Sequence, residues 1–172
     1  MLTASAEMFQ DPITKTIANF LIAIGIDVLP AALEGETFLP GILVDKGRLL
    51  VDETKLTYPG DLLHEAGHLA VAPSSIRPTL SGEVLLPDAD MDAVEVQATA
   101  WAYAAIRQLQ LDPKVLFHEG GYHGKSAGLI FTYTNGVYPG AQSLQDLGMT
   151  GGGEGDRKSE VPYPHMSKWL RD

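Results

Sequence analysis

The chain contains no cysteine among its 172 residues. Without a thiol it forms no disulfide, no thiolate nucleophile and no cysteine-ligated zinc site. Basic residues are also scarce: 12 lysines and arginines stand against 22 aspartates and glutamates, so the formal net charge is −10. A field of that sign repels phosphate backbones, and we therefore expect no nucleic-acid partner. The simplest interpretation of the acidic surplus is solubility, although carboxylates also attract cations.

Long uninterrupted apolar runs are missing as well. The most apolar stretch, residues 17–33, is interrupted by Asn19, Asp27 and Pro30 and is too short to span a bilayer. The first residues, MLTASAEMFQDP, carry no basic cluster of the kind that opens a signal peptide. We therefore expect a cytoplasmic protein with no membrane partner.

Local signals predict an α+β fold with an N-terminal helix, a short antiparallel sheet and two further helices. Asp11 followed by Pro12 is a typical helix start, and Gly25 is a typical helix end. The apolar stretches ILV and RLLV around the turn DKG indicate a hairpin over residues 42–51. Apolar spacing and flanking prolines predict the helices over residues 12–25, 59–72 and 90–111.

The second part of the chain has weaker patterns. Residues 1–111 form the predicted core, and residues 112–172 are a Gly-, Pro- and Tyr-rich segment that packs on this core or extends it. One or two short helices are expected in this segment, with a linker at GGGEGDRKSE, residues 151–160. The apolar side chain of Trp169 is expected to dock back onto the core.

The segment GDLLHEAGHLAVAP, residues 60–73, holds two of the five histidines of the chain. On a helix His64 and His68 lie one turn apart on one face, so both imidazoles can bind a single Zn²⁺ ion. Glu65 then lies on the flank, where its carboxylate can take a proton from a metal-activated water. Gly67 is costly in a helix and indicates that another backbone packs closely. The alternative is that both histidines are plain surface residues.

A catalytic zinc usually has three protein ligands, so a third residue is needed. The candidates are Glu83, Asp88, Asp90, Asp92, Glu95, His118 and His123. Glu95 is favoured because it interrupts an otherwise apolar helix, where a carboxylate is costly unless it is paired or bound to a metal. Alanines after Glu95 would let its helix pack tightly on the histidine helix. Alternatively, Asp92 and Glu95 share a solvent-exposed stripe.

The residues His64-Glu65-Ala66-Gly67-His68, followed by Glu95-Val-Gln-Ala98-Thr-Ala-Trp101-Ala102, resemble the two motifs of gluzincin zinc metallopeptidases. In pattern they are most similar to the ImmA/IrrE-type minimal peptidases. The resemblance covers residues 12–111 and implies a small zincin-like domain that hydrolyses peptide or protein substrates. It implies Zn²⁺ bound by His64, His68 and Glu95, with Glu65 as the general base.

The chain departs from that pattern after the ligand glutamate. Larger gluzincins place an aspartate four residues after it to orient a histidine, whereas this chain has Thr99. Asp92 is the alternative residue for that orienting role.

The donor for an oxyanion is expected in FHEGGYHGKS, residues 117–126, and we predict His123 for this role. The alternative is that its histidines are only loop residues. The strand RLLV is expected to align a substrate peptide by strand addition. The predicted function is a zinc metallopeptidase; the alternatives are a zincin-like module that binds metal without catalysis and a structural zinc site. Glu65 argues against the structural site, which needs no base.

Overall fold

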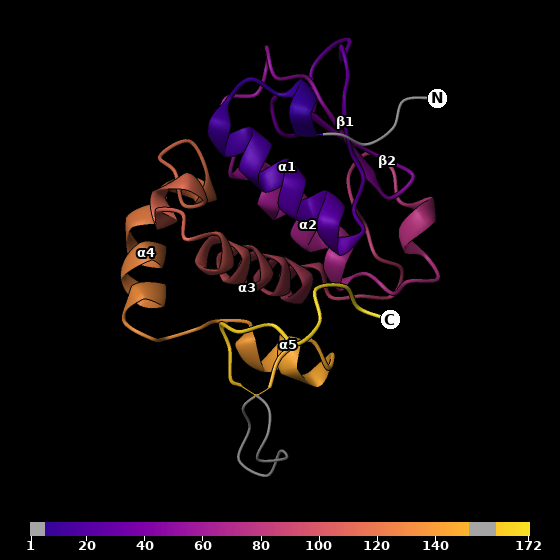
Figure 1. The fold of residues 1–172 in the computed structure, drawn as a ribbon. Coiled ribbons are helices and arrows are strands. Elements are labelled where there is room, and N and C mark those ends of the chain that lie inside the picture. Colours follow the sequence, from indigo (N-terminus) through magenta and orange to yellow (C-terminus); the bar gives the residue numbers. More distant parts are fainter. Residues whose placement is uncertain (1–5, 152–160) are drawn as a thin grey trace.

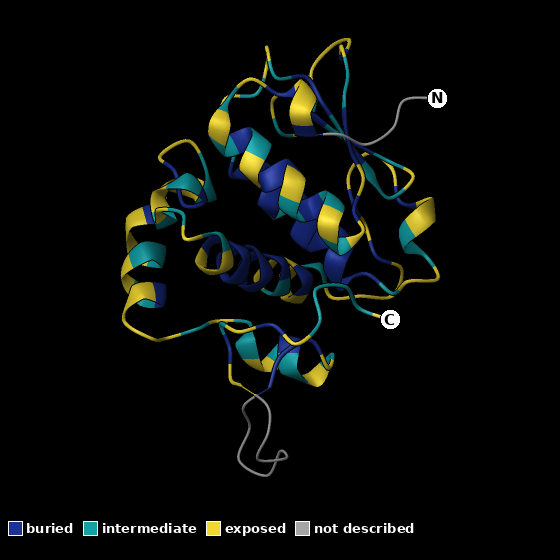
Figure 2. Ribbon diagram, viewed as in Figure 1, coloured by how far each residue is buried: buried dark blue, intermediate teal, exposed yellow. Residues whose placement is uncertain are grey.

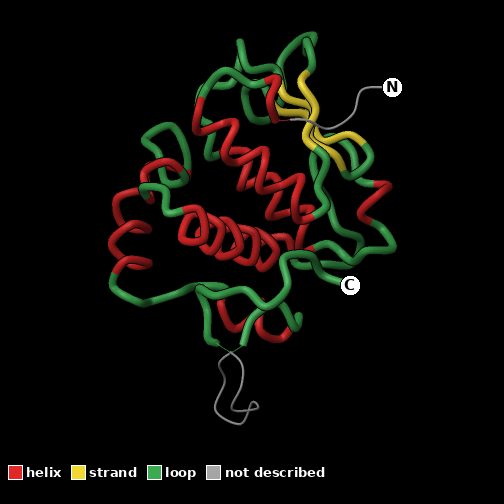
Figure 3. The backbone as a smooth tube through the Cα atoms, in the orientation of Figure 1, coloured by secondary structure: helices red, strands yellow, loops and turns green. Residues whose placement is uncertain are grey.

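The computed structural model describes residues 6–151 and 161–172, and this part of the chain combines five α-helices with a small three-stranded sheet (Figure 1). The predicted α+β class is therefore confirmed. The helices are α1 (Pro12–Ile24), α2 (Asp61–Val71), α3 (Met91–Leu109), α4 (Ser126–Thr134) and α5 (Ala141–Asp146), and the strands are β1 (Val28–Pro30), β2 (Ile42–Asp45) and β3 (Arg48–Val51). The strands gather at one end of the molecule, while helices and long loops make up the rest (Figure 3).

The start and end of α1 follow the predicted capping signals. The Asp11 carboxylate accepts a hydrogen bond of 2.7 Å from the backbone N–H of Thr14, which satisfies one of the free donors of the first turn. Gly25 adopts the left-handed conformation with φ of 103° and ends the helix. These two local interactions explain why the predicted boundaries lie within one residue of the observed ones.

The sheet is mixed, so the prediction of a purely antiparallel sheet was wrong. β2 and β3 form the predicted antiparallel hairpin, but β1 adds a parallel neighbour on the other side of β3. β1 includes Pro30 and has only three residues. A strand of this length is too short to show an alternating pattern in the sequence. β3 is the central strand and both of its sides are paired, so it cannot receive a substrate strand as expected.

Helix α2 lies at the centre of the fold, between α1 and α3 (Figure 2). Every residue of α2 is buried except His64, which is partly exposed. The predicted close packing at Gly67 is confirmed, because a Cβ atom added there would lie 2.6 Å from the carbonyl oxygen of Ala98 on α3. The two helix backbones therefore approach each other as closely as a glycine permits.

The end of the described chain packs against the helical core, as predicted for Trp169. The indole N–H of Trp101 donates a hydrogen bond of 2.9 Å to the carbonyl of Trp169, whose ring packs edge-on against Phe20. Two residues later, the N–H of Arg171 donates to the carbonyl of Ala70 at the end of α2. These contacts join the last described residues to segments 68 or more positions earlier in the chain.

The second part of the chain contains the two short helices α4 and α5, in line with the expected one or two. Most of the predicted linker, residues 152–160, lies outside the described residues. Among the helices that the structure describes, none has the length and apolarity needed to cross a membrane.

We predict that Gly67→Ala lowers the free energy of unfolding by about 1–3 kcal/mol, because the added methyl group must push α3 away from α2. The matched control is Gly128→Ala in α4, where an added Cβ meets no atom within 4 Å and the change should stabilise the helix slightly. Urea denaturation of both variants measures the difference. Equal stabilities would contradict the close packing.

Candidate metal centre

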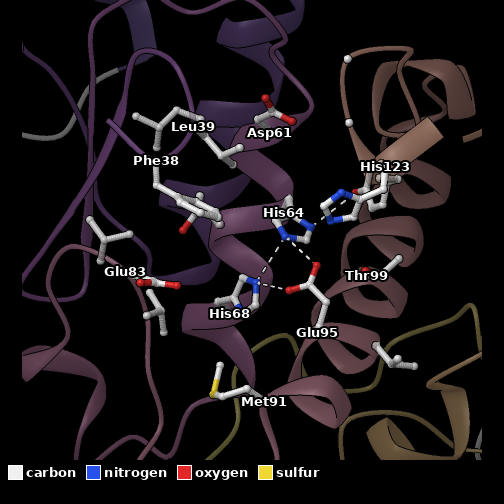
Figure 4. Close-up of a pocket in the computed structure, with 18 of the residues that line it drawn as sticks. Phe38, Leu39, Asp61, His64, His68, Glu83, Met91, Glu95, Thr99 and His123 are labelled. Carbon is white, nitrogen blue, oxygen red and sulfur yellow. Dashed lines mark hydrogen bonds and ion pairs between the residues drawn. The ribbon is translucent and has the colours of Figure 1, made fainter. Parts of the chain in front are cut away.

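Three side chains from α2 and α3 converge on one point (Figure 4). The Nε2 atom of His64 lies 3.1 Å from Oε1 of Glu95, and the Nε2 atom of His68 lies 3.0 Å from Oε2 of the same carboxylate. The two Nε2 atoms are 3.3 Å apart. Because all the candidate ligand atoms lie within 4.8 Å of one another, this group could hold a metal ion.

The spacing of these atoms fits a small divalent cation. Tetrahedral Zn²⁺ with ligands at about 2.0–2.1 Å separates neighbouring ligand atoms by about 3.3 Å. The measured separations between the two imidazoles and the carboxylate, 3.0–3.3 Å, are close to that value. Two imidazoles and one carboxylate are also a ligand set that catalytic zinc accepts. The residues predicted as ligands therefore have both the donor chemistry and the spacing that zinc needs.

His64 and Glu95 each stabilise the charged form of the other. Burial alone would lower the pKa of His64, but the hydrogen bond and the negative charge of Glu95 outweigh it and raise the pKa. The same hydrogen bonds from His64 and His68 hold the pKa of the Glu95 carboxyl well below its usual range. These hydrogen bonds and the half-exposed position of its side chain both favour the charged form of Glu95.

Glu65 lies beside this group without belonging to it. It is 8% exposed, and burial raises the pKa of its carboxyl, with both histidines acting in the opposite direction. It lines the same cleft as His64, His68 and Glu95. A carboxylate whose pKa is raised takes up a proton more readily, which is what a general base requires.

The cleft around the three side chains has a volume of about 980 Å³. In Figure 4, Phe38, Leu39 and Glu83 lie on one side of the two histidines, and Thr99 and His123 on the other. Among the other candidates for the third ligand, Glu83, Asp92 and His123 line the cleft outside the converging group. Asp90 instead caps α3, and its carboxylate accepts from the N–H of Asp92.

Tyr122 is the residue that the structure places behind His64. Its hydroxyl lies 3.4 Å from Nδ1 of His64, while the Nε2 atom of that ring faces Glu95. Burial raises the pKa of Tyr122 above its usual value, so the phenol stays neutral. A partner on the far nitrogen fixes the orientation and tautomer of a ligand histidine. The sequence pattern pointed to Asp92 for this orienting role, but among the described residues the Asp92 side chain forms no hydrogen bond or ion pair with either histidine.

His123, the predicted oxyanion donor, is exposed and lines the cleft. Its side chain makes no hydrogen bond or ion pair with any described residue, and its backbone has φ of 51°. Its role in stabilising an oxyanion stays a prediction.

Sequence reasoning missed a buried pair, His118 and Asp61. This pair anchors the loop that carries Tyr122 and His123 to α2. Nε2 of His118 lies 2.6 Å from Oδ1 of Asp61, and both side chains are buried. The ring of Tyr58 stacks on His118 with centroids 3.7 Å apart. The two partners are 57 residues apart, so no local pattern reveals them. Because Asp61 lies one turn before His64, the pair positions the loop with Tyr122 next to the metal-ligand candidates.

We predict that His118→Ala lowers the free energy of unfolding by about 3–5 kcal/mol, because it leaves the buried Asp61 without its partner. The matched control is His123→Ala in the same loop. That exposed side chain should change stability by no more than about 0.5 kcal/mol. Chemical denaturation of the two variants measures both values, and similar losses would show that the buried pair does not anchor the loop.

Comparisons of this chain with models of known protein families, with curated proteins and with solved structures find no match. The likeness to gluzincin peptidases therefore stays a prediction from the two motifs. The basis for a functional assignment is the geometry of His64, Glu65, His68 and Glu95.

Proposed function

We propose that the protein is a zinc-dependent hydrolase that cleaves peptide bonds. The observation that carries the proposal is the convergence of His64, His68 and Glu95 at 3.0–3.3 Å with Glu65 in the same cleft. Bound Zn²⁺ supplies Lewis acidity, which polarises a carbonyl group and acidifies water.

The remaining chemistry belongs to side chains of this protein. His64 and His68 hold the cation through Nε2, and Glu95 contributes a carboxylate oxygen and a negative charge. Glu65 accepts the proton of the attacking water on its carboxylate and passes it to the leaving amine. Tyr122 keeps the ring of His64 oriented through Nδ1, and His123 is the proposed donor to the developing oxyanion.

A catalytic role is favoured over a structural one by the position of Glu65. A closed structural site needs no additional carboxylate, and burying one raises the free energy of its charged form. Here the carboxyl is buried, its pKa is raised, and it faces a cleft large enough for a substrate. That arrangement suits a base that exchanges protons with a bound molecule.

A peptide substrate is supported by the strand that borders the cleft. Ile42, Leu43 and Val44 of β2 line it, and β2 is an edge strand of the sheet. Edge strands have free backbone groups that pair with an extended chain. The N–H of Ile42 already donates to the carbonyl of Leu39, so we propose that the backbone groups of β2 that stay free take the aligning role expected for β3. The loop after α2 already covers part of this edge, since the N–H of Gly82 donates to the carbonyl of Val44.

We predict about one zinc ion per chain in the wild-type protein, since the site offers three ligands. Alanine at His64, His68 or Glu95 should each reduce the zinc content to near zero. The controls His165→Ala and Asp92→Asn, at exposed positions, should keep it. Elemental analysis after dialysis against zinc and then metal-free buffer gives the values. Full zinc retention in the Glu95→Ala protein would exclude Glu95 as the third ligand.

We predict that Glu65→Gln keeps the zinc but lowers the rate of peptide cleavage by about 10²–10⁴-fold, because the amide cannot accept the proton. Glu34→Gln, at an exposed position outside the cleft, is the matched control and should cleave normally. The assay follows new amino termini in a mixed peptide library. Equal cleavage by wild type and Glu65→Gln would refute Glu65 as the base, and no cleavage by the zinc-loaded wild type would favour a non-catalytic metal-binding module.

A further inference from the structure

Exposed apolar side chains gather at the mouth of the cleft. Phe38 is 77% exposed, Leu85 57% and Val96 42%, and all three line the cleft. They belong to separate segments: the loop before β2, the loop before α3, and α3 itself. We call these three residues the apolar rim. Apolar side chains left in water around a cavity mark a surface that a partner covers.

Acidic side chains lie among these apolar residues. Glu36, Glu83, Asp92 and Glu119 are exposed, line the cleft and form no ion pair with any described residue. We call them the acidic rim. Lys125 is the one lysine or arginine among the described lining residues. The rim therefore produces a negative potential at the entrance, which attracts cations and repels acidic chains.

In the loop before β2 and in the loop before α3, a residue of the acidic rim precedes a residue of the apolar rim by the same number of positions. Glu36 precedes Phe38 by two positions, and Glu83 precedes Leu85 by two positions. Each loop thus offers a carboxylate and an apolar side chain close together. A bound chain that presents apolar and basic side chains on the same face can meet both kinds of group at each loop.

We propose that the occupant of this cleft is an extended peptide segment of another protein, with apolar side chains flanked by lysine or arginine. The inference deepens the proposed peptidase function and rests on it. A second copy of this chain is a poor occupant, because it brings a net charge of −10 toward the acidic rim. Nucleic acid is a poor occupant for the same reason.

The test measures binding of three blocked peptides to the full-length Glu65→Gln protein, with and without zinc. One peptide repeats two leucines followed by two lysines, so that each face of the extended chain carries both; one replaces each lysine by glutamate, and one replaces each leucine by serine. Fluorescence anisotropy should show the leucine–lysine peptide binding at least about tenfold more tightly than either of the others, because it loses neither apolar burial nor charge attraction. Its affinity should fall as salt is added.

Matched variants of the same protein assign the effect to the two rims. Phe38→Ala should weaken binding by about tenfold, since it removes apolar area that the peptide buries. Phe131→Ala is its control, because Phe131 is 70% exposed on α4 and lies outside the cleft lining. The double variant Glu36→Gln, Glu83→Gln should weaken binding and reduce its salt dependence, whereas Glu34→Gln should do neither.

Three results would overturn the inference: equal affinity for the three peptides, equal losses in the Phe38 and Phe131 variants, or a dimer that Phe38→Ala converts to a monomer. Failure of the peptidase proposal is a separate outcome. Binding is measured without hydrolysis, so tight binding of the leucine–lysine peptide without cleavage by the wild type would identify a peptide-binding module. If the wild type cleaves peptides but shows no preference for the leucine–lysine peptide, the role given to the two rims is refuted, whereas the peptidase proposal stands.

Discussion

The geometry of the site depends on how closely α2 approaches α3. A Cβ atom at Gly67 would lie 2.6 Å from the carbonyl oxygen of Ala98, so only a glycine permits this contact. Gly67 directly precedes His68, and Ala98 lies three residues after Glu95, so the contact sets the distance between the imidazoles and the carboxylate. Gly60 has a similar role at the other end of α2, where an added Cβ would overlap the carbonyl of Val115. Small residues at these two points hold the functional side chains within reach of one another.

The second constraint is electrostatic. Asp61, Glu65 and His68 lie on a helix that is buried along almost its whole length, where charged groups are costly unless they are compensated. Asp61 is paired with His118, and His68 is paired with Glu95. Glu65 forms no hydrogen bond or ion pair with any residue that the structure describes, and burial raises the pKa of its carboxyl. Glu65 therefore differs from the paired groups of this helix: its buried carboxyl lines the cleft, which is why we propose it as the general base.

Sequence reasoning succeeded where the signal was local. Capping residues defined α1, a turn signal defined the β2–β3 hairpin, and the apolar surroundings of Glu95 pointed to the side chain that meets both histidines. Sequence reasoning failed where the partners are far apart in the sequence or where the backbone conformation decides the placement of a side chain. β1 is too short to show a pattern, and the Asp61–His118 pair joins residues 57 positions apart. Tyr122 and His123 are neighbours with similar left-handed backbones, and only their three-dimensional placement shows that the tyrosine hydroxyl reaches His64.

The contact between Arg171 and α2 bears on how the protein is made. Arg171 donates its backbone N–H to the carbonyl of Ala70 and a side-chain N–H to that of Val71, while Arg77 donates to the carbonyl of Arg171. A ribosome that adds about 5–20 residues per second reaches position 171 several seconds after α2 has been synthesised. Arg77, only a few residues after α2, already donates to the carbonyls of Leu69 and Ala72, so only the carbonyls of Ala70 and Val71 wait for Arg171. Until position 171 has been synthesised, the carbonyls of Ala70 and Val71 lack the partner that Arg171 provides in the folded chain.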